Sequence, residues 1–334
     1  MSSPIIKVEN LTKVYPGGVL AVDHISFEVY EGEIFALLGP NGAGKSTTIG
    51  MLTTSLKPTE GEAYVAGYSI RKEPAKVRAA IGVVPQEFSA DEDLTGWENI
   101  TLIGALYGLP KETIVKRATE LLQTVNLYSF KDKKVETYSG GMRRRLEIAM
   151  GLINRPKILF LDEPTLGLDV QTRAAIWEYI LTLKKEYNMT IFLTTHYLEE
   201  ADMYSDRVAI IDKGRILVIG KPEELKKSVT WDTIIVEVEG YNQSVSSHLM
   251  EIPNVKGFNF SDGKLIIKAS DGPSSIPLIV SALSSSGLKV KRLSMERPSL
   301  DEVYMHYTGR SIREESITKE EAFALRRTLR RARA

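Results

Sequence analysis

Residues 39–46 read Gly-Pro-Asn-Gly-Ala-Gly-Lys-Ser, and this glycine-rich stretch decides the fold of the chain. Two glycines stand five residues apart and lysine and serine follow, which is the pattern of a phosphate-binding P-loop. The apolar run at 33–38 predicts a buried strand before it, and residues 46–52 predict a helix start after it. Such a turn aims successive backbone N–H groups at one anion, and the helix N-terminus adds donors and a positive dipole end. The stretch therefore predicts an α/β fold that binds the phosphates of a nucleoside triphosphate.

Two side chains of this stretch have specific expected roles. Lys45 is expected to reach the β- and γ-phosphates, and the hydroxyl of Ser46 is expected to face Mg²⁺. Upstream, Tyr15 precedes the turn signal Pro16-Gly17-Gly18. An exposed aromatic ring there would stack on a nucleobase, whereas a packed one would only support the turn. The spacing alone leaves both readings of Tyr15 open.

Composition indicates an ordinary globular protein with more than one domain. The chain has 334 residues, 43% of them hydrophobic and 26% charged, and this length favours two domains. Its 43 basic and 43 acidic residues cancel, so no global field points to nucleic acid. The absence of cysteine excludes disulfides, cysteine-bound zinc and a thiol nucleophile. No apolar run approaches the roughly 20 residues of a membrane helix, so we expect any membrane-spanning part to be another chain.

Polar side chains follow three of the predicted buried strands. The run 157–161 ends in Asp162 and Glu163, where the first acid fits the Mg²⁺ role of P-loop enzymes and the second can polarise an attacking water. The strands at 81–85 and 190–195 end in Gln86 and His196. A loop glutamine is usually only solvated and a lone histidine is usually structural. However, ligands of open α/β sheets bind at the carboxyl ends of the strands, and this shared edge favours a functional role for His196, whereas spacing alone favours a solvated Gln86.

A helical insertion separates these strands, and its last helix begins with a second candidate anion site. Helices are predicted at 95–107 and 112–125. Ser139-Gly140-Gly141 opens a further helix, with Ser139 as the expected N-cap. The two glycines would let an anion approach the first N–H groups of that helix closely. A plain capped helix start is the alternative reading of the same residues.

The C-terminal third reads as a separate small domain followed by a charged tail. Residues 230–309 alternate in the order β-α-β-β-α-β, which predicts a small α+β ferredoxin-like sandwich with a closing helix. We find no catalytic constellation there and expect an accessory or regulatory module. The tail 310–334 is rich in arginine, so it is either a solvated segment or a contact to an anionic membrane surface.

Taken together, these motifs resemble those of the ATP-binding cassette (ABC) family over about residues 4–222. The resemblance implies that Gln86 is the family's Q-loop residue, Asp162 the Walker B acid, Glu163 the catalytic base, Asp169 the D-loop acid and His196 the switch histidine. It implies that ATP and Mg²⁺ are the cofactors, with catalysis by Lys45, Gln86, Glu163 and His196 and metal binding by Ser46, Gln86 and Asp162. The residues expected to contact nucleotide are Tyr15, Gly39, Pro40, Asn41, Gly42, Ala43, Gly44, Lys45, Ser46, Thr47, Ser139, Gly140, Gly141 and Asp169.

Two departures from the family pattern narrow the resemblance. Tyr138 and Met142 stand where the family usually has leucine and glutamine. Methionine cannot make the hydrogen bonds of an amide, although the Ser-Gly-Gly turn is intact. This variant, together with the segment 298–304, is similar to the daunorubicin-resistance-type ATPase subunits of drug and lipid exporters.

The resemblance implies a P-loop ABC ATPase core (4–222) with antiparallel β and helical (about 88–155) subdomains, followed by the domain at 230–309. It also implies a head-to-tail homodimer in which two chains clamp each ATP, and a separate transmembrane permease as partner. We accordingly expect a cytoplasmic protein, peripheral on the inner face of the membrane, with no nucleic acid bound. A soluble ABC ATPase acting on nucleic acid or ribosomes is the alternative, but such proteins usually carry two cassettes or a long coiled coil. The transported substrate cannot be read from this chain.

Overall fold

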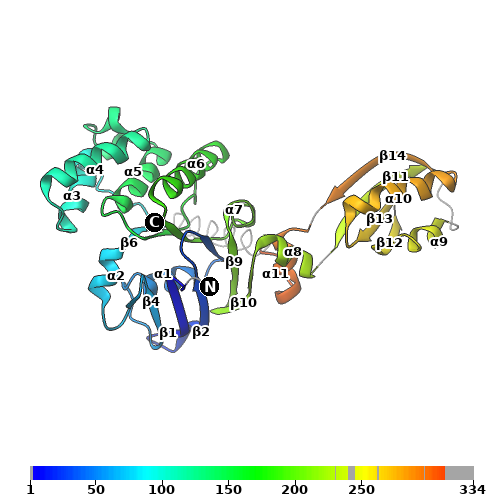
Figure 1. Ribbon diagram of the computed structural model, residues 1–334, viewed down its shortest axis with the longest axis horizontal. Helices are drawn as coiled ribbons and strands as arrows, with labels where there is room; N and C mark the ends of the chain where they lie inside the picture. The colour runs from blue at the N-terminus through cyan, green and yellow to red at the C-terminus, as the bar shows by residue number, and fades with distance from the viewer. Residues whose placement is uncertain (1–2, 230, 240–244, 262, 297, 313–334) are drawn as a thin grey trace, which may run out of the picture. The chain divides into compact units, whose positions relative to one another are not determined.

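The computed structural model describes residues 3–229, 231–239, 245–261, 263–296 and 298–312. The chain divides into two compact units, Met1–Gly220 and Lys221–Ala334 (Figure 1). Among the described residues, no helix is both long and apolar enough to cross a membrane. The arginine-rich part of the predicted tail, from residue 313 onward, lies outside the described residues.

A six-stranded sheet forms the centre of the first unit, in the order β10-β9-β3-β8-β7-β6. Neighbouring strands from β9 to β6 are parallel, and β10 joins β9 as an antiparallel hairpin. Every residue of β3, β7 and β8 is buried, which explains their continuous apolar sequences. The strands are β3 (Ile34–Leu38), β6 (Ile81–Val84), β7 (Ile158–Asp162), β8 (Thr190–Thr195), β9 (Arg207–Asp212) and β10 (Arg215–Gly220).

An antiparallel sheet in the order β2-β1-β4-β5 covers one side of this core. Its strands alternate buried and exposed residues, as expected for a sheet with one buried face. Phe27 of this sheet stacks on Phe35 of β3 with ring centroids 5.4 Å apart, so the two sheets share one hydrophobic core. The strands are β1 (Ile6–Tyr15), β2 (Val19–Val29), β4 (Glu60–Val65) and β5 (Tyr68–Ser69).

The helical insertion lies between the neighbouring strands β6 and β7. Helices α3, α4 and α5 group together in Figure 1 and pack on one another. A capping box of Thr95 and Glu98 fixes the start of α3. The helices of the unit are α1 (Lys45–Leu52), α2 (Pro74–Ala80), α3 (Gly96–Leu106), α4 (Lys111–Thr124), α5 (Gly140–Leu152), α6 (Val170–Tyr187) and α7 (Leu198–Tyr204), with short 3-10 turns η1 (Tyr128–Phe130) and η2 (Val135–Thr137).

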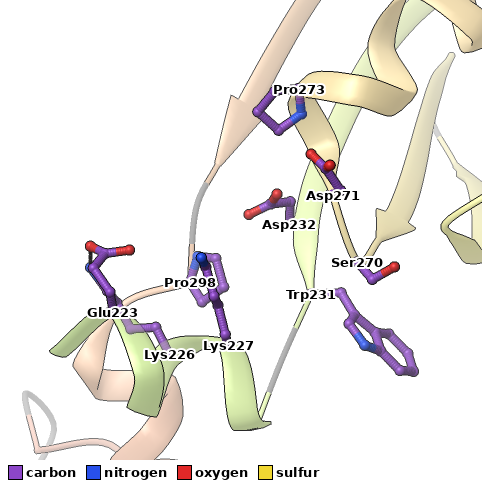
Figure 2. A pocket seen from close by; sticks show the side chains of 9 residues that line it. All are labelled: Glu223, Lys226, Lys227, Trp231, Asp232, Ser270, Asp271, Pro273 and Pro298. Atoms are coloured by element: carbon purple, nitrogen blue, oxygen red, sulfur yellow. Dashed lines mark hydrogen bonds and ion pairs between the residues drawn. The ribbon is translucent and has the colours of Figure 1, made fainter. Parts of the chain in front are cut away.

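The second unit contains an antiparallel four-stranded sheet in the order β12-β13-β11-β14. The chain order β-α-β-β-α-β and this strand order confirm the predicted ferredoxin-like sandwich. A cleft of about 450 Å³ in this unit is lined by residues including Lys226, Trp231 and Asp271, none of them a predicted site residue (Figure 2). The elements are α8 (Pro222–Val229), β11 (Asp232–Glu239), α9 (Val245–Met250), β12 (Val255–Ser261), β13 (Lys264–Ala269), α10 (Gly272–Ser285), β14 (Lys289–Glu296) and α11 (Leu300–Thr308).

Candidate nucleotide site

The glycine-rich turn connects the end of β3 to the start of α1, as the sequence predicts. Gly44 adopts a φ of 103°, a left-handed conformation that side chains other than glycine rarely take. A Cβ atom at Gly39 would lie 2.2 Å from the carbonyl oxygen of Ile211, so the adjoining strand leaves room only for glycine. In the turn between them, Ala43 is buried while Asn41 and Gly42 are exposed. The turn is therefore built to present backbone rather than side chains.

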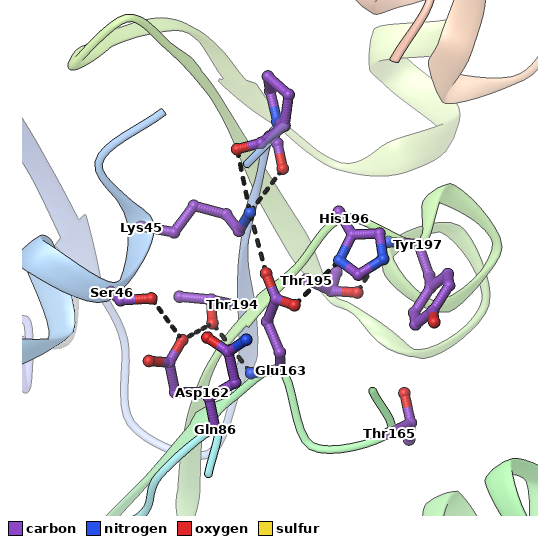
Figure 3. Close-up of polar contacts among 12 residues, drawn as sticks. Lys45, Ser46, Gln86, Asp162, Glu163, Thr165, Thr194, Thr195, His196 and Tyr197 are labelled. Atoms are coloured by element: carbon purple, nitrogen blue, oxygen red, sulfur yellow. Dashed lines mark hydrogen bonds and ion pairs between the residues drawn. The ribbon is translucent and has the colours of Figure 1, made fainter. Parts of the chain in front are cut away.

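Lys45, the first residue of α1, is held inside this turn (Figure 3). Its side chain is only 4% exposed, and Nζ donates to the carbonyl oxygens of Gly39 at 2.7 Å and Pro40 at 3.1 Å. The same nitrogen lies 3.1 Å from Oε1 of Glu163 at the end of β7. The P-loop lysine and the predicted catalytic acid therefore form a buried ion pair.

Asp162, the last residue of β7, faces the hydroxyl of Ser46. Ser46 Oγ donates to Asp162 Oδ1 at 3.2 Å, and the hydroxyl of Thr194 on β8 donates to the same oxygen. Burial raises the pKa of Asp162, although these two hydrogen bonds act in the opposite direction. A partly desolvated carboxylate beside an exposed serine hydroxyl is a donor set of oxygen atoms, which suits a hard divalent cation.

Glu163 adopts a strained backbone conformation, with φ at 47°. Its N–H donates to the carbonyl oxygen and hydroxyl of Thr194, and its Oε2 lies 3.0 Å from Nδ1 of His196. Burial acts to raise the pKa of Glu163, but the hydrogen bond from His196 and the charge of Lys45 outweigh it and lower the pKa below its usual value. The structure thus holds Glu163 as a carboxylate between two potential cations.

Gln86 lies beside this cluster and Tyr15 lies beside α1, and each belongs to another element. Gln86 stands in the loop 85–89 after β6, and Figure 3 shows its side chain pointing toward the carboxyl groups at the end of β7. Tyr15 ends β1, and its hydroxyl lies 3.3 Å from the hydroxyl of Thr47 on α1. Its ring is therefore positioned beside the helix that begins at Lys45.

The second predicted anion site belongs to the helical group. Ser139 is the N-cap of α5, as predicted, and its hydroxyl accepts from the N–H of Met142 at 3.3 Å. A Cβ atom at Gly141 would come within 2.6 Å of the methyl group of Thr172 on α6, so this close approach requires glycine. Asp169 caps α6 and accepts from Thr172, so the predicted D-loop acid and the Ser-Gly-Gly turn are adjacent in one chain.

A buried polar cluster behind His196 escaped the sequence analysis. Glu200 on α7 is 3% exposed and accepts from the hydroxyls of Thr165 and Thr195, which follow Glu163 and precede His196. Thr194, whose hydroxyl donates to the carboxylate of Asp162 and accepts from the backbone N–H of Glu163, was missed as well. An acid four residues after a histidine, as at Glu200, does not by itself predict a buried contact. Thr194 and Thr195, however, could have been identified because they and His196 are three consecutive polar residues at the end of an apolar strand.

Comparison with known proteins identifies the family. The chain is 39% identical over 310 residues to the doxorubicin resistance ATP-binding protein DrrA of Mycobacterium tuberculosis (strain CDC 1551 / Oshkosh), covering 91% of this chain and 93% of that protein. The chain belongs to the ABC transporter family. Within it, residues 22–166 match the ABC transporter domain and residues 220–308 match the C-terminal domain of ATP-binding proteins like DrrA1-3. This ABC protein accordingly binds and hydrolyses ATP.

Two further relatives support the assignment, one over most of the chain and one in three dimensions. The linearmycin resistance ATP-binding protein LnrL of Bacillus subtilis (strain 168) is 37% identical, with 93% of this ABC protein and all of the relative covered. The ATP-binding cassette MJ0796, solved as a dimer in a post-hydrolysis state with ADP and Pi, superposes with a TM-score of 0.59 at 32% identity. That superposition covers 65% of this chain and 98% of the other.

Proposed function

We propose that this chain is the ATP-hydrolysing subunit of an exporter and drives a separate transmembrane permease. The proposal of ATP hydrolysis rests on the buried cluster of Lys45, Glu163 and His196, which lies beside the P-loop turn. The names of the relatives supply the context, since they include resistance proteins and the Nod factor export ATP-binding protein I of Ralstonia nicotianae. The cargo is a property of the permease.

The chemistry follows from the charges of this cluster. ATP brings a γ-phosphate into the turn, and Lys45 exchanges its bonds to the Gly39 and Pro40 carbonyls for bonds to phosphate oxygen. Glu163, freed from Lys45 and still held as a carboxylate by the hydrogen bond from His196, accepts a hydrogen bond from the attacking water and orients it. His196 then donates toward the γ-phosphate and stabilises the charge that develops there.

Magnesium fits the oxygen atoms that meet beside the P-loop. Ser46, Asp162 and Gln86 would hold the ion through a hydroxyl, a carboxylate and an amide oxygen, all ligands that Mg²⁺ prefers. When bound, the ion would offset negative charge on the phosphate groups. Thr194 orients the Asp162 carboxylate toward Ser46 through its own hydrogen bond.

The second half of each site comes from another copy of the chain. Ser139, Gly140 and Gly141 form a helix N-terminus whose N–H groups are suited to a phosphate, and their position on the helical group separates them from the P-loop turn. MJ0796, the relative described above, was solved as a dimer. We infer a head-to-tail homodimer in which the Ser-Gly-Gly turn of one copy closes the P-loop site of the other.

A mixing experiment tests the shared site. Lys45→Ala disables the P-loop half and Ser139→Phe disables the other half, so each variant alone should hydrolyse ATP at least about a hundredfold more slowly than the parent. When the two are mixed, one intact site forms in every heterodimer and ATPase activity should reappear. If the mixture stays as inactive as its components, the two halves do not come from different chains. The matched control is Lys45→Ala mixed with a Lys45→Ala/Ser139→Phe double variant, which cannot form an intact site.

Membrane partnership needs a separate measurement. The tagged chain, purified from solubilised membranes of its own cell, should bring with it a protein with several transmembrane helices, and the complex should hydrolyse ATP faster when substrate is added. Recovery of the chain alone, or with nucleic acid, contradicts the proposal. For the tail, a variant ending at Gly309 that still binds anionic vesicles fully would exclude residues 310–334 as the membrane contact.

A further inference from the structure

A buried ion pair on α5 has no part in the mechanism above. Arg144 is 1% exposed and Glu147 is 2% exposed, and Nη1 of the arginine lies 3.0 Å from Oε2 of the glutamate one turn later. Burial lowers the pKa of Arg144 and raises the pKa of Glu147, so the protein interior disfavours the charge on both. Since a buried pair of this kind adds little stability over well-packed apolar residues, its contacts outside the helix indicate its purpose.

Both side chains hold the backbone of the loop that carries Gln86. Arg144 donates to the carbonyl oxygen of Pro85 at 2.7 Å and to that of Gln86 at 2.9 Å. Glu147 accepts from the backbone N–H of Ser89 and, at 3.3 Å, from its hydroxyl. The loop 85–89 is therefore bound near both of its ends by side chains from a single turn of α5.

The same helix begins at the Ser-Gly-Gly turn. α5 runs without interruption over Gly140–Leu152 with Ser139 as its N-cap, so Arg144 lies little more than one helical turn after Ser139. A displacement of the N-terminus of α5 is thereby transmitted to Arg144 and Glu147, and through their hydrogen bonds to the loop at 85–89. The neighbouring Arg145 points elsewhere, since its Nη1 donates to the carbonyl oxygen of Val125.

We propose that Arg144 and Glu147 are positioning residues that couple the Ser139-Gly140-Gly141 turn to Gln86 of the same chain. The inference rests on the proposed shared site. In that dimer the Ser-Gly-Gly turn touches the nucleotide held by the partner copy, whereas Gln86 serves the nucleotide of its own P-loop. The ion pair thus links the two ATP sites of the dimer: closure of one site orders the glutamine of the other.

Hydrogen–deuterium exchange with and without saturating ATP tests this link in the Glu163→Gln background, where hydrolysis is blocked. ATP should slow exchange in two peptides, one covering residues 139–142 and one covering residues 85–89, by about tenfold each. Adding Arg144→Met should leave the slowing at 139–142 intact and reduce that at 85–89 to less than about twofold. Arg145→Met, the matched control on the same helix, should leave both signals unchanged.

The outcomes separate the inference from the function on which it rests. If residues 139–142 gain no protection in the Glu163→Gln parent, the shared site itself fails. If they do and the Arg144→Met variant keeps its protection at 85–89, the coupling is refuted. Should Arg144→Met unfold because Glu147 is left unpaired, the pair Arg144→Met/Glu147→Leu removes both charges together. Selective loss at 85–89 in that variant supports the coupling, whereas retention at 85–89 or loss of both signals overturns it.

Discussion

The buried pair of Lys45 and Glu163 makes a quantitative prediction about the nucleotide-free protein. The two charges lie 3.1 Å apart with 4% and 5% of their side chains exposed. At an effective dielectric constant near 20, their attraction is about 5 kcal/mol before the desolvation of both groups is subtracted. Lys45→Met leaves a buried carboxylate with His196 as its remaining ionisable partner in the cluster, and should lower the free energy of unfolding by about 3 kcal/mol.

Glu163→Gln should have a smaller effect, about 1–2 kcal/mol, because the amide oxygen still accepts from Lys45. The Lys45→Met/Glu163→Gln double variant no longer contains a buried unpaired charge at this position. It should therefore be about 2 kcal/mol more stable than the sum of the two single effects predicts.

Urea denaturation without nucleotide measures this cycle, with the fluorescence of Trp97 and Trp177 reporting the first unit after Trp231 is replaced by phenylalanine. The exposed pair Glu73 and Lys76, 2.9 Å apart with 38% and 63% of their side chains exposed, is the matched control, and its two substitutions should have effects that add within the margin of error of the measurement. If the effects of Lys45→Met and Glu163→Gln also add within that margin, the two side chains do not stabilise each other and the prediction is refuted.

Three other substitutions test individual residues. Tyr15→Ala should weaken ATP binding by up to about tenfold while Tyr15→Phe does not, because stacking on adenine needs only the ring; equal dissociation constants by calorimetry argue against stacking. His196→Ala should reduce turnover at saturating ATP by about a hundredfold or more with little change in ATP affinity, and a retained rate in a steady-state assay excludes the proposed charge stabilisation. Burial raises the pKa of Glu200 above its unfolded value near 4.3, so the folded state binds this proton more tightly and the contribution of Glu200 to the wild-type free energy of unfolding falls as the pH rises from there through the folded pKa. Glu200→Gln lacks this dependence, so the stability of the variant relative to wild type should increase as the pH rises from about 4.3 to neutrality; urea midpoints of the two proteins that shift equally over this range contradict the pKa shift.

Local sequence patterns were sufficient to predict most of the fold and those parts of the site that lie on single helices, strands or turns. The P-loop turn depends on its own glycines, so its position between a strand and a helix was predictable, as was the capping of α5 by Ser139. The ferredoxin-like unit followed from the order of its alternating strands. Glu163 and His196 could be placed at one sheet edge because parallel strands end on the same side.

Contacts between distant segments could not be predicted in the same way. The left-handed conformation of Glu163 and its pairing with Lys45 depend on the order of the strands, in which β8 lies between β3 and β7, and no local pattern encodes that order. Arg144 stands in a run of three arginines that reads equally well as a solvated helix face. Its burial against the loop 85–89 follows only from the placement of α5 beside β6.

The central claim is that two copies of the chain share each ATP site. The molecular mass of the Glu163→Gln variant in solution tests this claim most directly. Without hydrolysis the two copies should remain clamped around ATP, so light scattering should show a monomer without nucleotide and a dimer with saturating ATP and Mg²⁺. The additional substitution Ser139→Phe should abolish that dimer while ATP still binds to the P-loop. If Glu163→Gln remains monomeric at saturating ATP, or if the dimer survives Ser139→Phe, the two copies do not share the nucleotide in the way proposed.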